Sequence, residues 1–312
     1  MALLTPLDEP TARALLAEYG LALERLEALP AHGTVNSNFR VRASGRDWFL
    51  RVNEGKTDDD VAREAALIER LRSGGLRTPE VKKSTNGRAF LRLGEKPVTL
   101  FPWLDAREAS PQPSDPSTVR VVGRALAELH RAGRGLDAAA LPRDHYTLDE
   151  LERRLRRFAA DARLAGIAPR LAEELARARR RPALPSGLVH QDLFPDNLLV
   201  DGAGELVAIL DLEQATFGPY VYDLAVAVNA WCWDGERIVR AAADAVLDAY
   251  HALRPLEPAE RAAFPDEARR AAARFTITRI TDVFLADGVD PELRARKDFA
   301  EYARRLEFWS RA

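Results

Sequence analysis

Hydrophobic and polar positions alternate with different periods in the two parts of the chain. Up to about residue 104, short apolar runs separated by turns that contain Gly or Asn predict strands at 38–42, 48–52, 88–93 and 97–101. Apolar residues recur with a helical period over 58–73, which ends at Gly74-Gly75. Residues 11–19 predict another helix, and 21–29 fits either a helix or an irregular strand. We therefore expect the chain to begin with a small β-rich part.

From residue 111 onward the spacing of apolar residues predicts an almost wholly helical structure. Helices are expected at 117–132, within 148–180, and at 222–233, 236–253, 258–285 and 291–311. The only strands expected here form a hairpin, 193–200 with 205–210, around the turn Asp201-Gly202-Ala203-Gly204. The pattern predicts an α+β fold of two lobes, with an N-terminal β-rich lobe at 1–104 and a larger helical lobe at 105–312.

Composition narrows the class of protein. The chain has 312 residues, 46% of them hydrophobic, so a sizeable core can form without disulfides. A net charge of −2 argues against a nucleic-acid-binding surface, and the single cysteine, Cys232, fits a reducing compartment. The first residues lack the basic start and apolar run of a signal peptide, and no run reaches the ~18 apolar residues of a membrane span. We expect a soluble cytoplasmic protein without nucleic-acid or membrane partners.

The candidate catalytic and metal-binding residues lie in the segment 188–211. His190-Gln191-Asp192 is followed five residues after the Asp by Asn197, and the next apolar strand ends at Asp211. A phosphoryl-transfer site needs a carboxylate that receives the proton of the acceptor hydroxyl, and an amide and a second carboxylate that hold Mg²⁺. Asp192 is the expected base, and Asn197 with Asp211 the expected metal pair. Each of these residues alone is also common as a turn or helix cap, so the joint spacing is what favours a kinase.

The β-rich lobe offers candidates for binding the nucleotide. Arg51 ends the strand at 48–52 and Glu64 lies on the next helix, where a kinase needs a phosphate-binding cation and an acid to orient it. The loop before the strands contains Gly33, Asn36, Ser37 and Asn38, which fit either phosphate contacts or simple turn formation. Pro102, Trp103 and Leu104 lie where the lobes are expected to meet, a usual place for a nucleotide cleft.

Taken together, these motifs resemble the aminoglycoside phosphotransferase and choline kinase superfamily, which has a protein-kinase-like fold. Within it the chain is most similar to the homoserine kinases of this fold. That likeness rests on Asn-Ser-Asn-Phe at 36–39, Asp-Leu-Phe-Pro-Asp-Asn at 192–197, Tyr-Asp-Leu-Ala at 222–225 and Val-Asn-Ala-Trp-Cys at 228–232. The C-terminal segments 274–279 and 297–306 are similar to theirs too. The chain departs from those proteins at 211–213, where Asp-Leu-Glu stands in place of Asp-Phe-Tyr.

The resemblance implies ATP, Mg²⁺ and an amino-acid-like hydroxyl acceptor, L-homoserine. Candidate acceptor residues are Asn229, Trp231, Arg279 and Glu213. Arg279 could equally pair with Asp282 three residues on, and Trp231 could be a core aromatic. Asp223 is expected to anchor the catalytic hairpin. The residues leave open another small alcohol as acceptor (choline, ethanolamine, a sugar or an aminoglycoside), or a pseudokinase that binds nucleotide without transferring phosphate.

Overall fold

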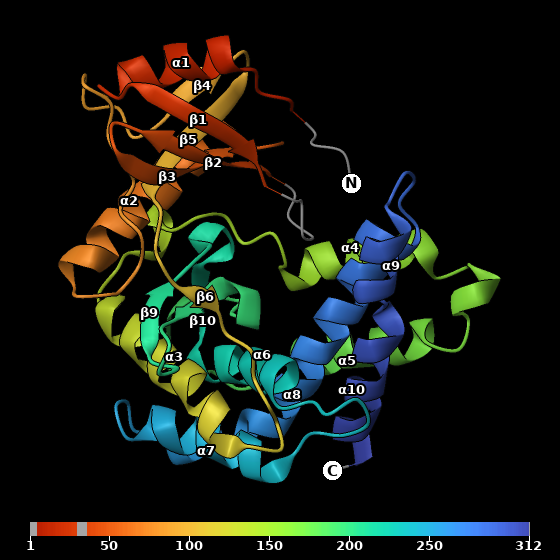
Figure 1. Ribbon diagram of the computed structural model, residues 1–312. Coiled ribbons are helices and arrows are strands. Elements are labelled where there is room, and N and C mark those ends of the chain that lie inside the picture. The colour runs from red at the N-terminus through yellow and green to blue at the C-terminus, as the bar shows by residue number, and fades with distance from the viewer. Residues whose placement is uncertain (1–4, 30–35, 312) are drawn as a thin grey trace.

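The computed structural model describes residues 5–29 and 36–311, and in this part of the chain an antiparallel sheet covers a larger helical body (Figure 1). The sheet has the strand order β1-β2-β3-β5-β4. Its strands are β1 (Leu23–Ala28), β2 (Ser37–Ala43), β3 (Arg46–Val52), β4 (Leu91–Leu93) and β5 (Lys96–Pro102). Helix α1 (Glu9–Glu18) lies on the sheet, and α2 (Asp58–Ser73) lies between the sheet and the helical body.

Local sequence explains the two elements of this part that matter most for the site. The turn between β2 and β3 is tight because Ser44 and Gly45 adopt positive φ values of 49° and 74°. Helix α2 begins with a capping box, in which Thr57 and Asp60 satisfy each other's backbone N–H groups. Its buried face includes Glu64, a charged residue among the apolar side chains of that face. The cap and the apolar face together bring Glu64 under the sheet.

The helical body is built around α3 (Arg120–Ala132), α6 (Tyr220–Trp231) and α8 (Pro258–Arg279). Around these lie α4 (Leu148–Phe158), α5 (Ala168–Ala178), α7 (Arg240–His251), α9 (Pro291–Arg296) and α10 (Phe299–Arg311). Helices α3 and α7 approach closely at Gly123, where a Cβ atom would lie 2.2 Å from the carbonyl oxygen of Val246. Helix α8 continues into a short π-helical turn, Ile280–Phe284.

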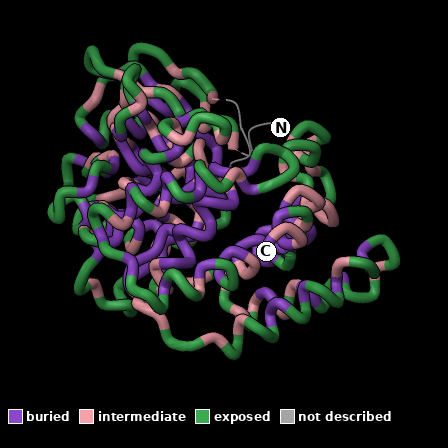
Figure 2. The backbone as a smooth tube through the Cα atoms, turned by 90° about the horizontal axis from the view of Figure 1, so that it is seen from below, coloured by how far each residue is buried: buried purple, intermediate pink, exposed green. Residues whose placement is uncertain are grey.

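Buried residues form two clusters in the described chain. The smaller lies within the sheet and α1 and spans residues 12–100, whereas the larger includes the buried face of α2 and runs to Trp309. Seen from below, the buried stretches gather in the interior of the helical body and the exposed turns lie on its outside (Figure 2). Helix α2 therefore packs with the helical body although it lies in sequence between two strands of the sheet, β3 and β4.

The structure differs from the expected elements in several places. Of the two alternatives for 21–29 the strand is confirmed, as β1 at Leu23–Ala28, whereas the single helix expected at 291–311 divides into α9 and α10 at Lys297. The expectation of a single hairpin in the second part was wrong. Strands β8 (Leu198–Val200) and β9 (Leu206–Ile209) form that hairpin, but β6 (Arg107–Glu108) joins it, and β7 (Ser186–Val189) pairs with β10 (Thr216–Pro219). These strands have only two to four residues, too few to show a period of alternation.

Candidate active site

A cavity of about 820 Å³ lies between the sheet and the catalytic hairpin β8–β9. Residues of both parts line it, and they include eight of the residues singled out from the sequence: Asn38, Arg51, Glu64, Pro102, Trp103, Leu104, Asn197 and Asp211. Apolar walls come from side chains such as Phe49, Ile68 and Phe101. The fold thus gathers positions as distant as 38 and 211 around one mostly apolar cleft with a few charged groups, the usual composition of a ligand site.

The hairpin brings the two expected metal ligands together. Strands β8 and β9 pair Leu198 with Ile209, and the backbone N–H of Leu210 donates to the carbonyl oxygen of Asn197 at 2.9 Å. Asp211 then turns away from the strand in a left-handed conformation, with φ at 57°. The side-chain nitrogen of Asn197 donates to the carbonyl oxygen of Asp192 at 2.8 Å. One amide side chain therefore links the expected base to the expected metal position.

Asp223 on α6 holds the loop that carries Asp192. Its two carboxylate oxygens accept the backbone N–H groups of His190 at 2.6 Å and Gln191 at 2.7 Å. His130 of α3 adds a third contact, from Nε2 to Asp223 at 3.0 Å. Burial lowers the pKa of His130, although Asp223 opposes this, so the ring is held neutral with its Nε2–H donated to the carboxylate. Asp223 thus has the geometry of the anchor expected from the sequence.

The Asp192 carboxylate lies close to buried polar groups of the helical body. Its Oδ2 accepts a hydrogen bond of 3.0 Å from Nε2 of Gln214. Burial raises the pKa of Asp192 above its usual value, and the nearby guanidinium of Arg274 opposes this rise. A carboxylate in such a place is a better proton acceptor than one in water.

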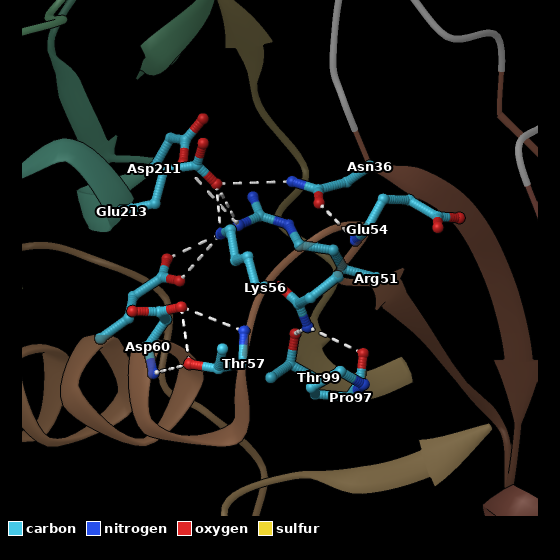
Figure 3. Close-up of polar contacts among 12 residues, drawn as sticks. Asn36, Arg51, Glu54, Lys56, Thr57, Asp60, Pro97, Thr99, Asp211 and Glu213 are labelled. Carbon is cyan, nitrogen blue, oxygen red and sulfur yellow. Dashed lines mark hydrogen bonds and ion pairs between the residues drawn. The ribbon is translucent and has the colours of Figure 1, made fainter. Parts of the chain in front are cut away.

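Five charged side chains meet beside the metal position (Figure 3). Nη1 of Arg51 lies 3.5 Å from Glu64 and 3.7 Å from Asp211. Lys56, in the loop between β3 and α2, contacts Glu213 and lies 3.4 Å from Glu64. Sequence reasoning missed Lys56 because it follows the strand and Arg51 already stood at the expected position. A lysine just before the acidic first turn of a predicted helix was the sequence feature that could have identified Lys56 as a site residue.

Two carboxylates of this cluster, Asp211 and Glu213, have opposite pKa shifts. Burial, with the neighbouring Glu213, raises the pKa of Asp211 well above its usual value. Burial also acts to raise the pKa of Glu213, but the charges of Lys56 and Arg51 outweigh it, and the pKa of Glu213 is lowered. Glu213 is therefore the ionised partner of Lys56, whereas burial and the charge of Glu213 both disfavour ionisation of Asp211.

The loop before β2 supports the sheet side of the cavity. Gly33 lies outside the described residues. Asn36 accepts the backbone N–H of Glu54 at 3.1 Å and reaches Glu213 at 3.4 Å, whereas the hydroxyl of Ser37 donates to Glu54 at 2.9 Å. Of these candidates Asn38 is the one that lines the cavity. The geometry gives Ser37 a role in holding the loop.

Two of the expected acceptor residues are enclosed by the protein. Asn229 is fully buried, donates to the carbonyl of Ala268 at 3.0 Å and accepts from Trp309 at 2.8 Å. Trp231 is also fully buried and donates its ring N–H to the carbonyl of Leu193 at 2.8 Å. Their polar groups are used in packing α6 against α8, α10 and the catalytic loop, so neither presents an atom to a ligand.

Arg279 takes a different partner from the one considered in the sequence. It donates to Glu301 at 2.9 Å and to the carbonyl of Asp298 at 3.0 Å, while Asp282 accepts from Arg154. The guanidinium carbon of Arg279 lies 4.5 Å from the ring centre of Tyr302. Burial raises the pKa of Tyr302 to about 12, and the charges of both Arg279 and Asp192 act on this tyrosine. Arg279 therefore packs on a buried ring whose pKa the charge of Asp192 also raises.

No helix in the described residues is both long and apolar enough to cross a membrane.

The sequence matches known proteins over most of its length. Residues 27–256 match the model of the phosphotransferase enzyme family. A homoserine kinase of Parvibaculum lavamentivorans is 33% identical, with 99% of this chain and 96% of that protein covered. A homoserine kinase of Pseudomonas aeruginosa is 34% identical, with 94% and 95% covered.

Solved structures share the fold at low identity. A spectinomycin phosphotransferase in complex with ADP and spectinomycin superposes with a TM-score of 0.73 at 14% identity, with 98% of each chain covered. An amicoumacin kinase in complex with AMP-PNP and Ca²⁺ gives a TM-score of 0.77 at 15% identity, with 98% of this chain and 94% of that chain covered. These neighbours confirm the protein-kinase-like fold expected from the sequence. The chain belongs to the phosphotransferase enzyme family, as a small-molecule phosphotransferase that acts on a hydroxyl group.

Proposed function

We propose that this enzyme transfers the γ-phosphoryl group of ATP to the hydroxyl of L-homoserine, with Asp192 as the base and Asn197 and Asp211 as the ligands of Mg²⁺. The main support for this reaction is that the structure brings Asp192, Asn197 and Asp211 together. Asn197 donates to the backbone of Asp192 and lines the same cavity as Asp211. A base beside a metal pair, at the end of a cleft between two lobes, is the arrangement that phosphoryl transfer requires.

The residues at the metal position suit a hard divalent cation. Among the described residues the buried Oδ1 of Asp211 has no hydrogen-bond partner. The side-chain nitrogen of Asn197 is used by Asp192, so the amide oxygen is the atom left for a cation. Mg²⁺ binds through one or two protein oxygens and fills its other positions with water and phosphate oxygens. When bound, it would neutralise charge on the β- and γ-phosphates.

The cavity supports ATP as the phosphoryl donor. Its apolar walls and the segment Pro102–Leu104 suit the planar adenine ring of ATP, and its charged end contains Arg51. The Trp103 backbone N–H donates to the backbone carbonyl oxygen of Asp47 at 3.1 Å, which fixes the segment that joins the two lobes. We assign the phosphates to Arg51 and Lys56, with Glu64 holding both cations in place. The two solved structures with ADP and AMP-PNP share this fold.

Asp192 does the proton chemistry in this proposal. The hydroxyl oxygen of the acceptor attacks the γ-phosphorus, the bond from that phosphorus to the bridging oxygen of ADP breaks, and the hydroxyl proton passes to Asp192. Burial raises the pKa of this carboxylate, which strengthens it as a proton acceptor. General-base help of this kind contributes about 10²–10⁴-fold to the rate.

Homoserine as the acceptor is supported by the curated relatives, which are named homoserine kinases and are similar over nearly the full length of the chain. Homoserine carries a carboxylate, and we assign its partner as Arg279. This guanidinium packs on Tyr302, whose pKa also responds to Asp192, and its partner Glu301 is shared with Arg305. Because Arg279 and Arg305 share the single carboxylate of Glu301, one positive charge remains for the carboxylate of homoserine.

An acceptor panel tests this assignment by ADP release. We expect L-homoserine to give a higher kcat/KM than choline, ethanolamine, an aminoglycoside or a sugar. Its carboxylate-free analogue 3-aminopropanol should be roughly ten- to hundredfold poorer, because a charged hydrogen bond contributes about 1.5–3 kcal/mol. Arg279→Leu should reduce this preference, whereas Arg177→Leu, which breaks the exposed pair with Glu173, should not. A better kcat/KM for choline or 3-aminopropanol would overturn homoserine and leave the kinase reaction standing.

A further inference from the structure

Gln214 lies between Arg274 and the expected base. It ends the short helical turn Leu212–Gln214 that follows Asp211. Nη2 of Arg274 donates to Oε1 of Gln214 at 2.6 Å, and Nε2 of Gln214 donates to Oδ2 of Asp192 at 3.0 Å. A guanidinium only donates and an ionised carboxylate only accepts, so these neighbours allow a single orientation of the Gln214 amide.

Arg274 is itself held rigidly. It is 2% exposed, and its guanidinium carbon lies 4.0 Å from the ring centre of Tyr146 and 4.2 Å from that of Phe275. Its Nη1 donates to the carbonyl oxygen of Gln191 at 2.6 Å. Gln191 has a φ of 67°, a strained value for a residue other than glycine, and it immediately precedes Asp192. One arginine therefore fixes both the backbone before the base and the amide that contacts the base.

The consequence is that the two oxygens of Asp192 are not equivalent. Oδ2 is occupied by Gln214, and within the described chain no hydrogen bond is found to Oδ1. The chain Arg274 to Gln214 to Asp192 sets the rotation of the carboxylate about its Cβ–Cγ bond. Without the Gln214 contact, the carboxylate could turn and present either oxygen, and a misplaced proton acceptor slows the reaction without weakening nucleotide binding.

We propose that Gln214 is a positioning residue, which holds Oδ2 of Asp192 so that Oδ1 faces the acceptor hydroxyl. This rests on the proposed function, because it requires Asp192 to be the base. It assigns a role to the residue that directly follows 211–213, where the chain departs from the Asp-Phe-Tyr expected of homoserine kinases. In the same segment Glu213 contacts Lys56 on the nucleotide side, so the turn joins the metal half of the site to the base half.

A double-mutant cycle tests whether Gln214 acts through Asp192. The variants are Gln214→Met, Asp192→Asn and the pair, with the exposed Gln112→Met as a matched control. Kinetic constants are measured with L-homoserine, or with whichever acceptor performs best in the panel, in single turnover where rates are low. We expect Gln214→Met to lower kcat roughly 10- to 100-fold, the usual effect of one hydrogen bond to a charged group, with KM for ATP changed by less than about twofold. In the Asp192→Asn background the same substitution should change kcat by less than about twofold.

A second variant separates the two contacts of Gln214. Gln214→Glu keeps an acceptor for Arg274 but removes the donor to Asp192, so it should lose at least as much kcat as Gln214→Met while melting at a temperature close to that of the wild type. Wild-type kcat in both Gln214 variants, or an equal fold-loss with and without Asp192, would overturn the positioning role and leave the base assignment intact. Wild-type kcat in Asp192→Asn alone would instead overturn the base assignment and the positioning role with it.

Discussion

At the scale of single residues, the site is short of positive charge. Arg51 and Lys56 face Glu64, Asp211 and Glu213, so carboxylates outnumber cations in the cluster. Burial and Glu213 together raise the pKa of Asp211. Such a group stabilises the fold below its unfolded pKa of about 3.9, and this stabilisation is lost as the pH rises through the folded value. At neutral pH Asp211 therefore makes the apo protein less stable, at the position where a cation is expected.

Asp211→Asn should consequently make the apo protein more stable and the enzyme inactive. We expect the melting temperature in EDTA to rise by roughly 1–3 °C, because a gain of about 1–2 kcal/mol shifts the melting temperature of a chain of this size by about 1.5 °C per kcal/mol. Turnover with Mg²⁺-ATP should fall by more than about tenfold. Thermal melts in EDTA and in Mg²⁺, together with ADP release, measure both effects. A melting temperature in EDTA below that of the wild type would contradict this account of the Asp211 charge.

At the scale of elements, helices α3 and α6 hold the catalytic loop through buried polar contacts. Asp223 accepts two backbone N–H groups of the loop and the Nε2–H of His130, while the hydroxyl of Tyr250 on α7 lies 2.7 Å from Nδ1 of His130. A neutral imidazole satisfies both neighbours, because it donates at Nε2 and accepts at Nδ1. A second proton on the ring would create a positive charge in a fully buried place, which burial disfavours.

His130 should make stability depend on pH in a definite direction. Its pKa is lowered in the folded state by burial, so its stabilising effect is present above the unfolded pKa of about 6.5 and is lost as the pH falls toward the folded value. The loss should reach at most about 1.4 kcal/mol for each pH unit below 6.5. Melting temperatures between pH 7.5 and 5 should fall less steeply for His130→Asn than for the wild type. The exposed His145→Asn serves as the control, and equal slopes for the His130 variant and the wild type would refute the assignment.

At the scale of the whole molecule, the cavity is bridged by ion pairs from its two sides. Arg51 and Lys56 come from the sheet and its following loop, whereas Asp211 and Glu213 come from the catalytic hairpin of the helical body (Figure 3). The two cations proposed to bind phosphate are thus held by the segment proposed to bind the metal before any nucleotide arrives. Pre-organised cations lose little freedom when they bind phosphate.

Lys56→Met should test this bridge. We expect KM for ATP to rise roughly ten- to hundredfold, the loss of one charge-assisted contact, while KM for the acceptor changes little. Lys83→Met is the matched control, because Lys83 pairs with Glu69 on the surface. Initial rates over a range of ATP concentrations provide the measurement. An unchanged KM for ATP would remove Lys56 from the phosphate site and leave it as a structural ion pair.

Much of the fold and the candidate site could be predicted from the sequence, because both depend on local patterns. The order of strands and helices follows from apolar periods and turn residues, and the spacing from Asp192 to Asn197 to Asp211 follows from one hairpin. Arg51 and Glu64 were recognisable because each has a set place on its own strand or helix. Residues within one hairpin or one helix are close in space whenever that element forms.

Only the tertiary structure decided how distant side chains pair. Lys56 meets Glu213 across 157 positions, and Arg274 meets Gln214 across 60, pairings that no local period encodes. The structure also enclosed Asn229 and Trp231, which the sequence left as candidates for a ligand, because α6 packs against α8 and α10 on that face. The sequence by itself determined which chemical groups the enzyme carries and the elements on which they lie. The packing of those elements determined which groups are buried, which of their pKa values shift, and which side chains remain available to a substrate.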